Sequence, residues 1–185
     1  MDRITDAFAK FDRADFVPDG VKNMSAADMP LPIGGGQTIS QPTTVGMMLE
    51  WLDAQPGDNV LDVGSGSGWT TALLSHIVGT KGRVYAVERV PELVEFGRDN
   101  CEKAGIRNAS FHQAGDKYGL AEYAPVDRIL VSASADKTPQ ELIDQLRPGG
   151  KLVLPVHNSI FEISKQQNNK TRAIEHPGFV FVPLL

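Results

Sequence analysis

The sequence has very few residues that could form covalent or metal cross-links. It contains one cysteine, Cys101, in 185 residues. A single thiol excludes an internal disulfide framework and a zinc site built from several thiolates. The four histidines, His76, His112, His157 and His176, are far apart and lack metal-ligand spacing. We therefore predict no metal site.

Long apolar runs and an excess of positive charge are also missing. No apolar run approaches the roughly 18 residues that a membrane helix needs. The N-terminus carries Asp2, Arg3 and Asp6, without the apolar segment of a secretory signal. Lysine and arginine total 18 against 23 acidic residues, a formal net charge of −5, which disfavours non-specific binding to a nucleic-acid backbone. We expect a cytoplasmic protein with no membrane or nucleic-acid partner.

The composition is that of one globular domain. Hydrophobic residues make up 41% of the chain and charged residues 22%, enough apolar mass for one core. We expect a single domain over 1–185, divided into an N-terminal helix and loop (1–42), an alternating core (43–156) and C-terminal strands (157–185).

The core alternates short apolar runs with helical patterns, which indicates βαβ units and a parallel sheet covered on both faces. The N-terminal residues Ile4, Phe8 and Phe11 have helical spacing, whereas 28–42 holds too much proline and glycine for a helix and is expected to be a long functional loop. The polar QQNNK segment predicts a turn between C-terminal strands. The fold class is therefore α/β, a doubly wound, mostly parallel Rossmann-like sheet with antiparallel C-terminal edge strands. The predicted strands are 60–64, 83–88, 110–115, 127–134 and 151–156, and the predicted helices run from Thr43 to before Pro56 and over 70–79, 92–105 and 138–150.

A glycine-rich turn, Gly-Ser-Gly-Ser-Gly at 64–68, follows the first of these strands. Such a turn lets a ligand approach the backbone closely. The dinucleotide pattern GxGxxG fails because Trp69 or Thr71 stands where its last glycine is needed. The phosphate-binding GK[ST] pattern and the nucleophile pattern GxSxG are also missing.

Two acids narrow the choice of ligand. Asp62 lies inside the strand before the turn, and Glu88 ends the next strand, 20 residues after Gly68. A carboxylate at the second position can bind two ribose hydroxyls. An acid at the first would repel a pyrophosphate but suits a ligand amine. S-adenosylmethionine has an amine, a ribose and no phosphate; the alternative is a tight turn beside surface acids.

The segments VLDVGSGSG and VYAVE resemble the first two motifs of the class I S-adenosylmethionine-dependent methyltransferases. That resemblance implies S-adenosyl-L-methionine as cofactor and S-adenosyl-L-homocysteine as product. It also suggests that Asp116, after Gly115, lies near the adenine amino group. Without this context Asp116 is equally well explained as a turn cap.

A second resemblance is more specific. The block DMPLPIGGGQTISQP (28–42) closely resembles the signature of protein-L-isoaspartate O-methyltransferases, and 124–135, 145–156 and 181–185 resemble later segments of that family. The resemblance runs from about Phe16 onward. It implies methylation of the α-carboxylate of L-isoaspartyl residues in damaged proteins or peptides. The resulting ester collapses spontaneously to a succinimide, so repair needs no second active site. We expect the protein to be a monomer.

The resemblance also assigns residues. It places the active-site serine at Ser40, which otherwise would be explained as a loop serine making a local turn bond. It implies acceptor contacts at Val131, Ser132, Ala133, Ser134, Ala135 and His157. The cofactor contacts that it implies are Gln37, Thr38, Ile39, Asp62, Gly64, Ser65, Gly66, Gly68, Glu88, Arg89, Asp116 and Lys117.

The chemistry agrees with so sparse a set of residues. A carboxylate has a pKa near 4, so it is already a nucleophile at neutral pH and needs no general base. The protein must align oxygen, methyl and sulfur, which can contribute roughly 7–11 kcal/mol, and must remove water from the carboxylate. Ser40 would hold the carboxylate or align the sulfonium rather than attack.

The sequence departs from the family pattern at Lys117 and His157, where glycine is usual, and at Phe161, which stands in the place of a usual glutamine. Relatives also commonly continue past Leu185. His157 is either a new carboxylate partner or a strand-end residue facing water. These departures leave two alternatives open: a carboxyl methyltransferase for another acceptor, and a cofactor-binding protein without turnover.

Overall fold

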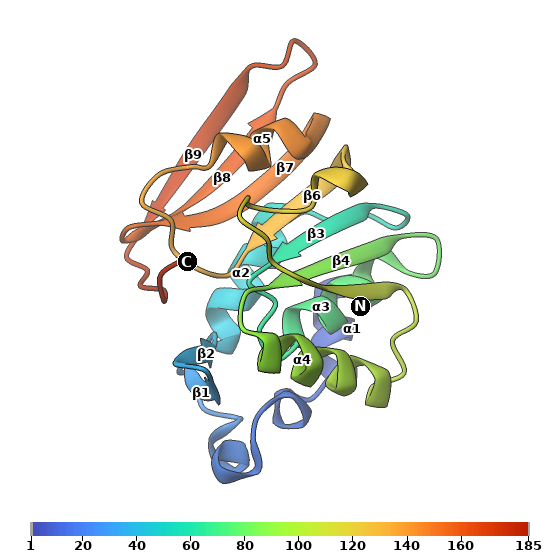
Figure 1. The fold of residues 1–185 in the computed structure, drawn as a ribbon, viewed down its shortest axis with the longest axis vertical. Helices are drawn as coiled ribbons and strands as arrows, with labels where there is room; N and C mark the ends of the chain where they lie inside the picture. The colour runs from blue at the N-terminus through green and yellow to red at the C-terminus, as the bar shows by residue number, and fades with distance from the viewer. Residues whose placement is uncertain (1, 185) are drawn as a thin grey trace.

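A seven-stranded sheet organises the chain in the computed structural model, which describes residues 2–184 (Figure 1). The strand order is β5-β4-β3-β6-β7-β8-β9. The first five of these pair in parallel, and β8 and β9 add to the β7 edge as an antiparallel hairpin. The strands are β3 (Asn59–Val63), β4 (Arg83–Glu88), β5 (Ala109–Gln113), β6 (Val126–Val131), β7 (Leu146–Val156), β8 (Ser159–Lys165) and β9 (Thr171–Pro177). The predicted fold class is confirmed.

Helices cover the two faces unequally. The four longer helices share one apolar cluster with one face of the sheet, and the short α5 packs in a second cluster on the other face (Figure 1). Alternate residues of each strand supply the two clusters: Val60 faces the first and Leu61 the second. The helices are α1 (Arg3–Lys10), α2 (Pro42–Leu52), α3 (Trp69–Val78), α4 (Pro91–Lys103) and α5 (Gln140–Gln145), with 3-10 turns η1 (Arg13–Phe16), η2 (Asp19–Met24) and η3 (Ala121–Tyr123). No helix within residues 2–184 is both long enough and apolar enough to span a membrane.

The sheet has a topological switch point between β3 and β6. The chain runs from β3 outward through β4 to β5 and then returns to β6 on the other side of β3. In an open parallel sheet this reversal leaves a crevice at the carboxyl ends of the two central strands. Here those ends lead into Gly64 after β3 and Ser132 after β6.

The segment 28–42 is more ordered than predicted. It forms a two-stranded antiparallel hairpin, β1 (Leu31–Gly34) and β2 (Gln37–Ile39), that is separate from the main sheet. Three consecutive glycines make the turn possible, because Gly34, Gly35 and Gly36 have φ angles of +100°, +57° and +72°. The prediction of a long functional loop therefore needs one correction, since part of this segment is regular β-structure.

Two predicted helix ends also need correction. The helix expected over 138–150 covers only Gln140–Gln145, because β7 begins at Leu146 and takes the glycines into a strand of irregular register. Its N-cap is Pro139, which makes no side-chain cap bond. Helix α2 ends at Leu52, since Asp53 adopts a left-handed conformation.

The closing segment 181–185 is not a regular strand in its described part. Residues 182–184 run beside the end of β6, where a single bridge joins Ser134 to Pro183. Ser134 N–H donates to the Val182 carbonyl at 2.7 Å, and Leu184 N–H donates to the Ser134 carbonyl at 2.8 Å. Leu185, which the prediction included, lies outside the described residues, as does Met1 of the N-terminal segment.

His157 is the first of the two residues that join β7 to β8, and its φ of +52° is left-handed. A residue with a side chain is strained in this conformation, whereas glycine is not. We predict that His157→Gly raises the free energy of unfolding by up to about 1 kcal/mol. Urea denaturation measures this change in the free energy of unfolding. Asn169→Gly, at φ +63° in the β8–β9 turn, is the control and should gain less because asparagine tolerates this region better. A His157→Gly variant less stable than the wild type would contradict the claim that the backbone is strained at His157.

Candidate active site

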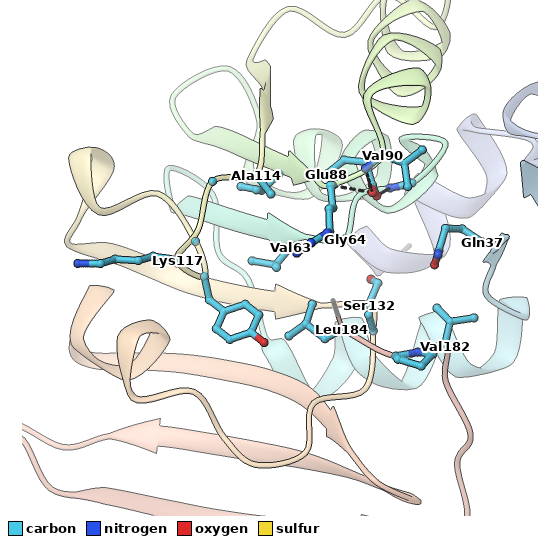
Figure 2. A pocket seen from close by; sticks show the side chains of 18 of the residues that line it. Gln37, Val63, Gly64, Glu88, Val90, Ala114, Lys117, Ser132, Val182 and Leu184 are labelled. Carbon is cyan, nitrogen blue, oxygen red and sulfur yellow. Dashed lines mark hydrogen bonds between the residues drawn. The ribbon is translucent and has the colours of Figure 1, made fainter. Parts of the chain in front are cut away.

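The main cavity lies in the crevice at the carboxyl ends of the central strands. The turns after β3, β4, β5 and β6 contribute Gly64, Glu88, Ala114 and Ser132 to its wall, and the β1–β2 hairpin contributes Gln37. Figure 2 shows Gln37 and Val182 on one side of it and Ala114 on the other, with Glu88 between them. Segments that are far apart in the sequence thus enclose one ligand-sized space.

The side chain of Glu88 is held in one position at the wall of this cavity. It is 7% exposed. Its Oε2 accepts a hydrogen bond from Gly66 N–H at 2.9 Å, and its Oε1 accepts from Arg89 N–H at 2.7 Å and Val90 N–H at 2.9 Å (Figure 2). These three donors hold the carboxylate in one orientation at the cavity wall. Lone pairs on Oε2 remain for a ligand hydroxyl, as a ribose site requires.

The glycine-rich turn serves two purposes. Gly64 and Gly66 line the cavity with φ angles of +76° and +51°, and a Cβ on Gly66 would come within 2.9 Å of Ile33 Cδ1. Gly68 does not line the cavity. A Cβ there would lie 2.7 Å from the carbonyl oxygen of Gly97, so this glycine is needed for the close packing of α3 on α4.

Asp62 lies behind the turn, not among the cavity-lining residues. Its side chain is fully buried, and Oδ2 accepts from Thr71 Oγ1 at 2.7 Å and Thr70 Oγ1 at 3.2 Å in the first turn of α3. Oδ1 has no partner within the described residues. Burial raises the Asp62 pKa to about 6. This placement favours anchoring of α3 over the predicted direct contact with a ligand amine.

The other predicted cofactor residues divide between two spaces. Gln37, Thr38, Arg89, Asp116 and Lys117 line the main cavity. In Figure 2 the Lys117 side chain extends away from Glu88 and the centre of the cavity. Ile39 and Ser65 line instead a small recess beneath the turn, which Ser40 and Trp69 also border.

Ser40 lies beside the main cavity rather than in it. It lines a groove of about 560 Å³ formed with Gln41, Thr44 and residues 178–182 of the C-terminal segment. Thr38, Ser132 and Val182 line both the groove and the main cavity, so these residues form the boundary between the two spaces. Ser40 thus stands on the side away from Glu88.

The predicted acceptor residues are only partly at this boundary. Ser132 and Ala133 line the main cavity. Val131 and Ala135 are buried, and Ser134 Oγ donates to the His157 carbonyl at 3.2 Å. These three residues and His157 line neither space, so their placement supports a structural contribution at the end of β6.

The structure adds a cavity wall that the sequence did not indicate. Tyr118, Gly119 and Glu141 line the cavity, and the buried Gln145 of α5 fixes this wall. Gln145 Nε2 donates to the Tyr118 carbonyl at 2.8 Å, and its Oε1 accepts from Leu120 N–H at 2.8 Å. A glutamine four residues before the paired glycines of a predicted helix end carries no motif that reveals such contacts.

The class of protein follows from this geometry. A switch-point cavity that has a glycine turn, a fixed carboxylate ending β4 and further carboxylates at Asp116 and Glu141 fits a cationic adenosyl ligand. This is the arrangement of a class I S-adenosylmethionine-dependent methyltransferase.

Comparison with known proteins gives the family. The family model described as "Protein-L-isoaspartate(D-aspartate) O-methyltransferase (PCMT)" matches residues 1–185, and the chain belongs to that family. It is 46% identical to the protein-L-isoaspartate O-methyltransferase of Aeropyrum pernix, covering 99% of this chain and 72% of that protein. The Pyrococcus horikoshii protein of the same name is 43% identical, with 100% and 85% covered.

Solved structures agree. A protein-L-isoaspartate O-methyltransferase superposes with a TM-score of 0.91 at 28% identity, and the match covers all of this chain but 62% of that one. A Plasmodium falciparum protein of the family, crystallised with S-adenosyl-L-homocysteine, gives a TM-score of 0.87 at 26% identity, with 100% and 91% covered. S-adenosylmethionine dependence, predicted from the glycine turn and Glu88, is confirmed.

The raised pKa of Asp62 predicts a pH dependence of stability. The unfolded carboxyl titrates near 3.8 and the folded one near 6. Its stabilising contribution is therefore complete below pH 4 and is lost as the pH rises through 6. We predict that the stability of the wild type relative to Asp62→Asn falls by about 2 kcal/mol between pH 4 and pH 7.5.

Urea unfolding at a series of pH values measures this difference. Asp53→Asn, at an exposed carboxylate, is the control and should give a much flatter difference. A difference between wild type and Asp62→Asn that does not change with pH would contradict the assigned protonation.

Proposed function

We propose that this protein transfers a methyl group from S-adenosylmethionine to the α-carboxylate of L-isoaspartyl residues in damaged proteins and peptides. The family match over 1–185 carries the proposal. The boundary between the Glu88 cavity and the Ser40 groove supports it, because a two-substrate transfer needs two adjoining spaces.

The cavity residues fit the cofactor. Glu88 offers carboxylate lone pairs to the ribose. Asp116 lies in the turn after β5, which forms one end of the cavity. The absence of side chains at Gly64 and Gly66 lets the cofactor approach the backbone closely. When bound there, S-adenosylmethionine supplies an electrophilic methyl group on a sulfonium. The carboxylates in the wall favour that positive charge over a phosphate ligand.

The groove fits an acceptor peptide. Its wall combines polar side chains of Ser40, Gln41 and Thr44 with the main chain and apolar side chains of 178–182. Phe179 and Phe181 are half-buried, and Val180 is 87% exposed at the lip. An extended peptide can therefore meet polar groups near the boundary and apolar surface farther out.

The residues need only to position and desolvate the acceptor. Its carboxylate is ionised at neutral pH and needs no base. Ser40 Oγ makes no hydrogen bond within the described residues, so it is free to donate to one carboxylate oxygen while the other attacks the methyl carbon. Ser132 lies across the boundary. The chain's task is alignment and exclusion of water.

We propose further that the working form is a monomer in the cytoplasm, acting on isoaspartyl proteins. The buried single thiol Cys101 supports a protein that needs no oxidising compartment. Light scattering of the purified protein tests the monomer.

The decisive assay compares two peptides. Labelled S-adenosylmethionine is incubated with the protein and an isoaspartyl peptide or its normal aspartyl twin. The proposal predicts label on the isoaspartyl peptide alone. Equal labelling of both would indicate a less selective carboxyl methyltransferase. Binding of S-adenosylhomocysteine without labelling of either peptide would indicate a cofactor-binding protein, and both results contradict the proposal.

The position of Ser40 predicts a selective kinetic defect. Because Ser40 lines the groove and not the Glu88 cavity, Ser40→Ala should lower kcat by about 10-fold or more while leaving cofactor affinity nearly unchanged. Steady-state kinetics and calorimetry with S-adenosylhomocysteine separate the two effects. Ser164→Ala, on β8, is the control. An unchanged kcat would remove Ser40 from the mechanism.

A further inference from the structure

Arg13 is a buried cation that neither space contacts. Its side chain is 4% exposed, in the 3-10 turn that follows α1. Within the described residues no carboxylate lies within salt-bridge distance of it. Burial lowers its pKa from the usual value, opposed by the charge of Asp28. A guanidinium without an ion-pair partner must be compensated by hydrogen bonds.

Five main-chain carbonyls provide that compensation. Nη1 donates to the carbonyls of Ser25 at 3.0 Å and Ala27 at 3.2 Å. Nη2 donates to those of Met29 at 2.7 Å, Ile39 at 3.3 Å and Ser40 at 3.0 Å. The five carbonyls belong to the two ends of the segment that forms the β1–β2 hairpin. One side chain therefore joins the entry of the hairpin to its exit.

The hairpin has little other main-chain support. It is not hydrogen-bonded to the main sheet, and its two strands pair at only three positions with an irregularity between Pro32 and Gly34. A two-stranded hairpin of this size is marginal alone. Yet Ile33, Gln37 and Thr38 must form part of the cavity wall. The buried side chains of Leu31, Ile33 and Ile39 pack the hairpin into the first apolar cluster, and the contacts from Arg13 hold its main chain at the two ends.

Arg13 also contacts the scaffold of the glycine turn. Its guanidinium carbon lies 5.7 Å from the ring centre of Trp69. Trp69 is the first residue of α3, directly after Gly68, and its indole N–H donates to the Phe11 carbonyl at 3.1 Å. The same side chain thus bridges Ser40 and the helix that carries the cofactor turn.

We propose that Arg13 is a positioning residue for methyl transfer: its five carbonyl contacts hold Ser40 and the hairpin in register with the glycine turn. The kinetic test of this inference rests on the function proposed above, because it measures methyl transfer. The planar fork is essential, because one guanidinium reaches carbonyls on both sides of the hairpin, whereas the compact ammonium of lysine cannot. Ser40 has no side-chain bond to correct a shift of its backbone, and a displacement near 1 Å can cost about 100-fold in rate.

The test uses Arg13→Lys and a matched control, Arg128→Lys. Arg128 is also buried and also donates to carbonyls, those of Leu52, Asp53 and Asp127, but it lies at the start of β6 away from both spaces. Both variants lose a buried guanidinium, so both should unfold at lower temperature. The kinetic constants are compared at a temperature at which circular dichroism shows that all three proteins are folded.

We expect Arg13→Lys to lower kcat at least about 10-fold, and Arg128→Lys to remain within about 2-fold of wild type. Amide hydrogen exchange should rise over 27–40 in Arg13→Lys and stay unchanged in β3 and β6. A folded Arg13→Lys variant with wild-type kcat overturns the proposal. Equal losses of kcat in the two variants also overturn it, because the effect would then be general destabilisation.

The wild type gives a test that does not depend on a folded variant or on the acceptor. If Arg13 fixes the hairpin, the β2 amides at 38–39 should exchange far more slowly than those of the three glycines at the hairpin tip, 34–36. Fast exchange at 38–39 would overturn the inference even if Arg13→Lys fails to fold. Absence of methyl transfer by the wild type, with slow exchange retained, would instead contradict the proposed function and leave Arg13 as the anchor of the hairpin.

Discussion

The carboxylate of Glu88 is the interaction on which the site depends. It ends β4 and accepts hydrogen bonds from the glycine turn at Gly66 and from the start of the next connection at Arg89 and Val90. The neighbouring β3 and β4 turns are therefore tied to each other at the place where a ligand ribose would be bound. The hairpin is fitted to the same unit, since a Cβ on Gly35 would come within 2.9 Å of Val90 Cγ1.

The rest of the site is added around this unit by parts of the chain that come from outside the parallel sheet. The hairpin before α2 and the segment 182–184 after β9 close the cavity from one side, and both border the Ser40 groove. In the proposed function the turns of the sheet hold the cofactor, whereas these attachments close the cofactor cavity and form the acceptor groove. This division explains how one fold can retain its cofactor while different acceptors are served.

The sheet side was predictable because its signals are local. The alternation of short apolar runs with helical patterns predicted the mostly parallel sheet, and the spacing from the glycine turn to Glu88 predicted S-adenosylmethionine as the cofactor. The attachments were not predictable in the same way. The shape of 28–42 depends on Arg13, and the wall at Tyr118 depends on Gln145; both act through main-chain carbonyls far away in sequence. Asp62, Gly68 and Val131 were assigned to ligand contact because sequence spacing does not distinguish a residue in the cavity wall from one directly behind it.

The central claim is that Glu88 fixes the cofactor site, and calorimetric titration tests it most directly. S-adenosylhomocysteine is titrated into the wild type, into Glu88→Gln and into Glu92→Gln, a control in the first turn of α4. A hydrogen bond to a charged group is worth about 1.5–3 kcal/mol, so the account predicts that Glu88→Gln weakens binding by roughly 10- to 100-fold. Glu92→Gln should bind like the wild type. Equal affinity of all three proteins would contradict the account.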